Sequence, residues 1–178
     1  MLKRRPRILG LFFAVAAAMA MSLVTAQASY AGAPLGPYKI ELGNGMCVQT
    51  NPTNNGPDIQ LVQEWCRPGG PAQLWYFWSL GNGDYHIQNA GNHDCMRARG
   101  NRNFSPVETI DCTNISDLSW HVGTPGNRWP FAYHPTSNIS TGGSPCLDVQ
   151  GGSGAAGTVI DVYQCNGTFA QLYFIYEQ

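Results

Sequence analysis

From residue 36 onward, short stretches of alternating apolar and polar residues are separated by turns rich in Gly, Asn and Pro. Residues 38–40 precede a Gly-Asn-Gly turn at 43–45, and residues 85–87 precede a Gly-Asn turn at 91–92. Short alternating runs with turn signals about every 8–12 residues are typical of strands in a β-barrel or β-sandwich. No segment keeps a helical apolar period long enough to compete with this pattern. The chain is therefore predicted to be all-β.

The six cysteines show that the pattern is repeated three times. They form three successive pairs whose members are 19, 17 and 19 residues apart, with a period near 50: Cys47 and Cys66, Cys95 and Cys112, Cys146 and Cys165. Fixed internal periods indicate a repeat architecture. Six cysteines allow 15 pairings by arithmetic, but the repeat favours three sequential bridges, one per copy. Each bridge would stabilise the fold by about 3 kcal/mol.

Each copy also repeats its strands and one aromatic residue. A strand precedes the first cysteine, one follows it, one ends at the second cysteine, and one begins at Trp75, Trp120 or Tyr173. One copy cannot bury its own apolar face, whereas three copies around a pseudo-threefold axis close a common core. We expect about twelve short strands, with these three aromatic residues in the core.

Residues 1–31 have the three regions of a secretory signal peptide. A basic start is followed by an apolar run from Ile8 to about Val24, and then by small residues that suggest cleavage after about Ala28 or Ala31. The alternative is a retained anchor, but the run is short for a membrane span. The sequence predicts a secreted, extracellular protein with no membrane span after cleavage.

Removal of this segment changes the charge balance. The whole chain has a net charge of −1, but residues 32–178 hold six basic and eleven acidic residues, which gives −5. An acidic protein gains nothing from counterion release on nucleic acid, so no nucleic-acid partner is expected. The low charged fraction of 12% also argues against disorder. No C-x-x-C motif or Cys/His cluster is present, so neither a metal nor a cofactor is expected.

The third copy reads Cys-Leu-Asp-Val at 146–149, and the first copy has Gln-Leu-Trp at 73–75. With three cysteine pairs in phase, these motifs resemble the repeats of ricin B-chain type lectins and are similar to family 13 carbohydrate-binding modules. The resemblance covers about residues 36–178, with repeats at about 36–80, 81–126 and 127–178. It implies a β-trefoil with pseudo-threefold symmetry and up to three shallow sugar pockets.

In such a pocket the resemblance implies a carboxylate acceptor for sugar hydroxyls, an aromatic ring that stacks on the pyranose, and polar side chains beside them. The third copy supplies Asp148, Asp161, Tyr163 and Gln171, with Ala170 where an Asn is expected. The first copy offers a weaker possible site from Gln49, Glu64 and Gln73. The second copy has Arg97, Glu108 and Ile110 at the matching places and is expected not to bind sugar.

Structural roles compete with several of these assignments. Asp148 could instead cap backbone amides in a turn, and Tyr163 could be an ordinary half-exposed strand residue. Gln73 and Gln171 are expected mainly to tie backbone segments together. Three further tryptophans fall outside the repeated pattern: Trp65, Trp78 and Trp129. They are expected to pack under loops, and the alternative is that one of them lines a further glycan platform.

These observations predict a non-catalytic, secreted lectin that binds a galactose- or xylose-type sugar or polysaccharide mainly through the third repeat. The four histidines form no H-E-x-x-H motif, and no cysteine is left over as a nucleophile. One alternative is a trefoil that has lost sugar binding and acts as a protein-interaction or inhibitor module. A small glycan-active enzyme is a more remote alternative, because distant carboxylate pairs leave no local motif.

Overall fold

The computed structural model describes residues 32–54, 56–113, 119–123, 134–136, 139–141 and 144–177. The expected signal peptide with its cleavage sites, and Trp129, lie outside the described residues. Within the described part of the chain, no helix is long and apolar enough to cross a membrane.

The described residues form thirteen short strands and three single-turn 3-10 helices, as the alternating pattern predicted for an all-β chain. The strands are β1 (Leu35–Leu42), β2 (Met46–Thr50), β3 (Ile59–Trp65), β4 (Leu74–Gly81), β5 (Asp84–Asn89), β6 (Cys95–Ala98), β7 (Ser105–Ile110), β8 (Ser119–Val122), β9 (His134–Thr136), β10 (Ile139–Ser140), β11 (Cys146–Val149), β12 (Ile160–Tyr163) and β13 (Tyr173–Glu177). The 3-10 helices are η1 (Pro71–Gln73), η3 (Gln150–Gly152) and η4 (Phe169–Gln171).

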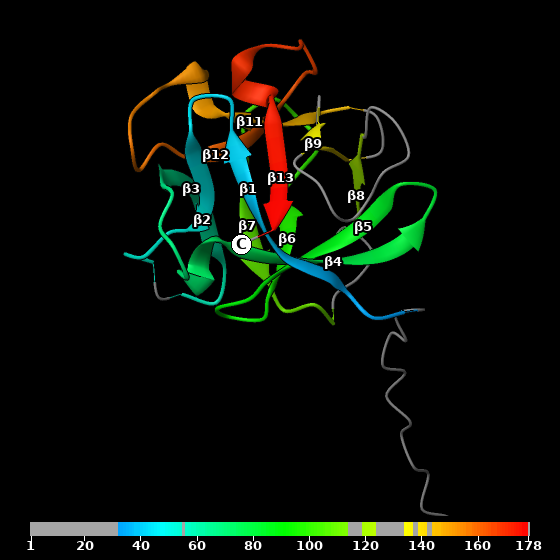
Figure 1. Ribbon diagram of the computed structural model, residues 1–178. Helices are drawn as coiled ribbons and strands as arrows, with labels where there is room; N and C mark the ends of the chain where they lie inside the picture. Colours follow the sequence, from blue (N-terminus) through cyan, green and yellow to red (C-terminus); the bar gives the residue numbers. More distant parts are fainter. Residues whose placement is uncertain are drawn as a thin grey trace, which may run out of the picture.

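The first and last strands close the structure on itself. β1 pairs antiparallel with β13 from Tyr38 opposite Glu177 to Leu42 opposite Tyr173, and the two strands run side by side through the centre of Figure 1. β1 also pairs with β4, and β4 with β5. Pairing both ends of the chain leaves neither end strand as an open edge.

Three equivalent hairpins meet one another and produce the predicted pseudo-threefold arrangement. They are β2–β3, β6–β7 and β11–β12, one in each copy. β3 pairs with β7 through Ile59 and Thr109, and β7 pairs with β12 through Pro106 and Asp161. A bridge between Val62 and Val159 completes the triangle. The fold is therefore a β-trefoil.

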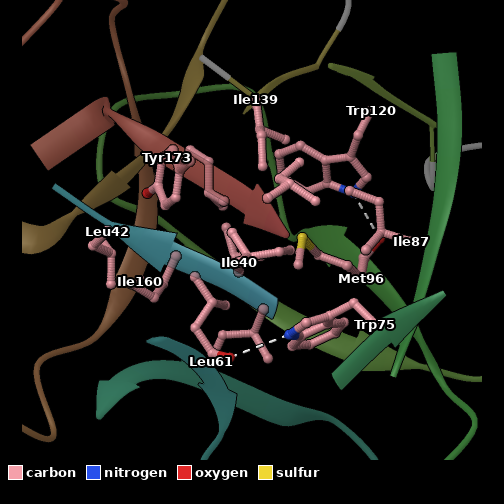
Figure 2. Close-up of a cluster of buried hydrophobic side chains, with 14 of the residues drawn as sticks. Ile40, Leu42, Leu61, Trp75, Ile87, Met96, Trp120, Ile139, Ile160 and Tyr173 are labelled. Atoms are coloured by element: carbon pink, nitrogen blue, oxygen red, sulfur yellow. Dashed lines mark hydrogen bonds between the residues drawn. The ribbon is translucent and has the colours of Figure 1, made fainter. Parts of the chain in front are cut away.

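The three repeated aromatic residues lie in the core, as expected. Trp75, Trp120 and Tyr173 are each 0% exposed, and Figure 2 shows them around Ile40. The Trp75 indole donates to the Val48 carbonyl at 3.2 Å, and the Trp120 indole donates to the Met96 carbonyl at 2.8 Å. The acceptor follows the first cysteine of its copy in both cases, so the two tryptophans hold equivalent backbone positions.

The predicted sequential disulfides are present. The bridges are Cys47–Cys66, Cys95–Cys112 and Cys146–Cys165. Each one joins the start of the first strand of a hairpin to the chain just beyond its second strand. The bridges therefore fix the ends of the hairpins that carry the candidate sugar-binding residues.

Candidate functional site

The three hairpins share one register, so equivalent positions can be compared directly. In each copy, the residue two places after the first cysteine lies opposite the residue four places before the second. These pairs are Gln49 with Val62, Arg97 with Glu108, and Asp148 with Asp161. Directly opposed residues project from the same face of an antiparallel pair. The same structural position is therefore occupied by a neutral pair in the first copy, an ion pair in the second and two acids in the third.

In the third copy the two acids are buried. Asp148 is 6% exposed and Asp161 is 0% exposed. Burial, together with the charge of Asp148, raises the pKa of Asp161 to about 6. Neither carboxylate oxygen of Asp161 has a partner at hydrogen-bond distance among the described residues. The nearby Gln150 side chain opposes part of the rise in the pKa of Asp161. Asp161 is thus ionised at pH 7 and takes up its proton at a higher pH than an ordinary aspartic acid does.

Asp148 is held by Gln171. Burial raises the pKa of Asp148, and a hydrogen bond with the Gln171 side chain opposes part of that rise. The Gln171 side chain, 1% exposed, also accepts from the Asn166 amide at 2.8 Å and donates to the Gln164 carbonyl at 3.1 Å. The expected structural role of Gln171 is thus present, and it also positions the acceptor carboxylate.

Asp148 and Tyr163 come together at the edge of a cavity of about 480 Å³. Asp161 and Gln171, which were expected to contact the sugar, are 0% and 1% exposed and do not line this cavity. Ala170 does line it, at the position where an Asn was expected. The cavity residues are Phe104, Asp148, Gly151, Gly152, Tyr163, Asn166, Thr168, Phe169 and Ala170.

The cavity wall includes two residues that the sequence did not indicate. Phe104, in the loop before β7, is 57% exposed, and Phe169, the first residue of η4, is 77% exposed. Phe104 belongs to the second copy and reaches the third because β7 pairs with β12. Phe169 could have been suspected from the sequence, because it is an aromatic residue close to the second cysteine of the third copy. The sequence around Phe104 gives no indication that this residue reaches the third copy.

Backbone without side chains forms another part of the wall. Gly151 and Gly152 have φ angles of +66° and +63°, in the left-handed region, and no atom would meet a Cβ at either position. Glycine adopts this backbone conformation without steric cost. The Gly-Gly turn after β11 therefore lets the backbone itself border the cavity beside Asp148.

In the first copy, the predicted polar residues bind one another. Gln49 is 6% exposed, and its side-chain oxygen accepts from the Gln73 amide at 2.8 Å. Gln73 also accepts from the Arg67 amide and donates to the Trp65 carbonyl, both at 2.8 Å. Glu64 accepts from the neighbouring Trp65 amide at 3.0 Å. These bonds occupy both polar atoms of the Gln73 side chain and the side-chain oxygen of Gln49.

The prediction that Trp65 packs under a loop is wrong. Its side chain is 61% exposed, because β3 ends there and the following chain turns away through Cys66. Trp78 differs: it is half-buried, and its indole donates to the Gln88 side chain at 3.0 Å.

In the second copy, an ion-pair cluster fills the equivalent position. Glu108 is 1% exposed, and its carboxylate pairs with the guanidinium groups of both Arg97 and Arg99. Arg99 also donates through Nε to Glu108 at 3.3 Å. Ile110, in the place of the stacking ring, is buried at 6% exposure. At these three positions the hairpin presents neither a free acceptor nor an aromatic platform.

Comparisons with known proteins agree with this arrangement. A family model described as ricin-type beta-trefoil lectin domain-like matches residues 29–113. No curated protein matches the chain in sequence.

Three solved structures share the fold. ThreeFoil, a designed 3-fold symmetric protein, has a TM-score of 0.67 at 16% identity, with 79% of this chain and 98% of that chain covered. The exo-beta-1,3-galactanase 1,3Gal43A from Clostridium thermocellum has a TM-score of 0.65 at 19% identity, with coverages of 79% and 30%. The ricin B-like lectin of Macrolepiota procera, in complex with lactose, has a TM-score of 0.65 at 14% identity, with coverages of 83% and 99%. Over residues 29–113 the chain is thus similar in sequence to ricin-type beta-trefoil lectin-like domains, and it shares the β-trefoil fold of these solved structures.

Proposed function

We propose that the protein is a secreted, non-catalytic lectin that binds a glycan through its third repeat. The observation that carries the proposal is the meeting of Asp148 and Tyr163 at one cavity. A carboxylate accepts hydrogen bonds from sugar hydroxyls, and an aromatic ring stacks on the apolar face of a pyranose. Gln171 acts on the sugar through Asp148, to which it is hydrogen-bonded, and Asp161 lies opposite Asp148 in the hairpin without touching the ligand.

The sugar class follows from the resemblance and is supported by the relatives. The Macrolepiota procera lectin was solved with lactose, and the earthworm R-type lectin C-half was solved with GalNAc. We propose a galactose- or xylose-type sugar, presented on a polysaccharide or a glycan. One small site binds a free sugar with a Kd on the order of 1 mM, so repeated ligands are needed for useful affinity.

The position of Asp161 supports a binding role without catalysis. A glycosidase needs two carboxyl groups that both flank the scissile bond. Asp161 is fully buried and does not line the cavity, so Asp148 is the sole carboxylate of the two that a ligand can touch. Secretion is proposed from the expected signal peptide and accords with the three disulfides.

A protein-interaction or inhibitor module is the second candidate. Ala170, which lines the cavity where a polar donor was expected, favours it. A pull-down that recovers a protein partner, undiminished by added sugars, would support this alternative over the lectin.

The test compares mature wild-type protein with Asp148→Asn on a glycan array and on immobilised polysaccharides. Asn keeps the shape of Asp148 but removes the charged acceptor. Asp58→Asn, an exposed acid in the first copy, is the control. We expect retention by the wild type and by Asp58→Asn, with at least a tenfold loss for Asp148→Asn. Equal retention of all three proteins contradicts the proposal.

A further inference from the structure

We propose that Phe104 forms a second sugar subsite, contributed by the second repeat to the site of the third, so that the cavity binds two or more consecutive units of an oligosaccharide. The inference rests on the proposed function and extends it from a single sugar to a chain. It assigns Phe104 a stacking role and Phe169 the role of the facing wall.

Phe104 stands beside the expected stacking ring. The rings of Phe104 and Tyr163 meet edge to face, with centroids 5.1 Å apart and an interplanar angle of 62°. This separation is comparable with the step between neighbouring sugar rings in an extended chain. Two aromatic platforms one step apart can therefore contact two consecutive sugars, the first of which also reaches Asp148.

The backbone of Phe104 is strained but firmly held. Its φ angle is +66°, in the left-handed region that bulky residues rarely adopt. Its amide donates to the Val162 carbonyl at 2.8 Å, and the Asn103 side chain accepts from the Gln164 amide at 2.8 Å. The loop of the second copy is thus fastened to β12 of the third. Strain of this kind is retained where the surrounding structure enforces it, often at binding sites.

Packing against the core does not explain why the Phe104 ring is at this position. Phe104 is 57% exposed although the loop is fixed on both sides, so the side chain contributes little to the core. A ring held rigidly at a cavity edge loses little conformational entropy when a ligand binds, which favours affinity.

Phe169 limits the cavity on another side. It is 77% exposed, yet its ring lies against Gly43, where an added Cβ would come within 3.2 Å of its Cδ1 atom. Phe169 also lines a smaller hollow of about 80 Å³ together with Leu42 and Asn44. It is therefore a ridge between two hollows, which suits a ligand longer than one ring.

The cavity is also larger than one sugar requires. Its volume of about 480 Å³ lies within the range of roughly 300–1,000 Å³ that is typical of pockets for drug-sized ligands. A single pyranose is smaller than the drug-sized ligands that such pockets hold. The free space beyond Asp148 and Tyr163 is bordered by the two phenylalanines.

The test measures affinity against chain length. The probes are xylose, xylobiose and xylotriose, and galactose, galactobiose and galactotriose, titrated calorimetrically. Phe104→Gly is the informative variant because glycine adopts the left-handed backbone freely and keeps the loop intact. Phe169→Ala tests the facing wall, and Trp65→Ala removes a similarly exposed aromatic residue outside the cavity as the control.

For the wild type and Trp65→Ala we expect about tenfold tighter binding of the trisaccharide than of the monosaccharide in the series that binds. Phe104→Gly should lose this gain and keep its monosaccharide affinity within about twofold. Wild-type affinity that does not rise with chain length, or a gain that survives in Phe104→Gly, overturns the subsite while leaving the lectin proposal standing. Absence of binding to every probe and to the glycan array overturns both.

Discussion

Asp148 lies directly opposite Asp161 across the β11–β12 hairpin, and both side chains are buried. The same register position in the second copy holds Arg97 opposite Glu108, an oppositely charged pair. Two like charges in direct opposition destabilise a strand pair, whereas an ion pair does not incur this cost. The two acids therefore destabilise the third hairpin at a position where the second hairpin holds an ion pair. The third hairpin is also the one that borders the cavity.

Replacement of Asp161 by Asn should stabilise the protein at neutral pH. The pKa of Asp161 is raised to about 6, so between about pH 4 and pH 6 the folded protein binds more protons than the unfolded chain. The unfolding free energy due to this group therefore falls as the pH rises through that window. Asp161→Asn cannot ionise and should gain about 1–3 kcal/mol at pH 7, with little change at pH 4.

Urea denaturation of the wild type and Asp161→Asn at pH 4 and pH 7 measures this difference, with Asp58→Asn as an exposed-acid control. A gain that is the same at both pH values, or a loss at pH 7, would show that the buried carboxylate is not the source of the cost.

Gln171 and Gln73 occupy equivalent places but should differ in function. Each ties two backbone segments together, so Gln171→Ala and Gln73→Ala should each lower the unfolding free energy by about 1–3 kcal/mol. Gln171→Ala alone should weaken sugar binding, because it alone releases Asp148. The measurements are urea unfolding and retention on the array. Equal effects of the two variants on retention would argue against the positioning role of Gln171.

Glu108→Ala should be strongly destabilising and still bind sugar. The change leaves Arg97, whose side chain is 25% exposed, without its buried partner. Loss of one member of a buried pair typically costs about 3–5 kcal/mol. Arg97→Met combined with Glu108→Met should recover most of the loss, because the charge that then loses its partner, that of Arg99, lies on a side chain that is 57% exposed to water. Denaturation and array retention test this prediction, and a fall in retention by the folded double variant would show that the Arg97–Glu108 position takes part in binding.

The third disulfide should matter for stability and for binding. Cys146 and Cys165 are 19 residues apart, as are Cys47 and Cys66, so each double Ala variant should lose about 3 kcal/mol and about 6–12 °C in Tm. At a temperature where both variants are folded, only loss of the third bridge should weaken sugar binding, because that bridge fixes β11 and β12. Thermal unfolding and calorimetry distinguish the two effects, and equal binding by the two variants would oppose the prediction.

Some features were predictable because they repeat along the chain. The cysteine period gave the correct bridges, and the spacing of Trp75, Trp120 and Tyr173 gave the core. Asp148 and Tyr163 became candidates through the resemblance to ricin B-chain type repeats, which implies an acid and an aromatic residue at set distances from the cysteines, and both line the cavity. The burial of Asp161 was not predictable, since alternation shows which residues share a face but not what covers that face.

Phe104 illustrates the remaining limit of local patterns. It reaches the cavity through pairing between β7 and β12, strands of different copies, and through a left-handed backbone at a residue other than glycine. Neither feature leaves a periodic signal. The exposure of Trp65 was predicted wrongly for a related reason. Trp65 is the last residue of β3, and the sequence pattern does not show where that strand ends.

The central claim, that the third repeat binds sugar, is tested most directly by amide chemical shifts of the isotope-labelled protein titrated with lactose and with xylobiose. We expect the shifts induced by the sugar that binds to centre on Gly151, Gly152, Asn166 and Thr168, which line the cavity, and to disappear in Asp148→Asn. Shifts centred on Gln49 or Arg97, or shifts that persist unchanged in Asp148→Asn, would contradict the account.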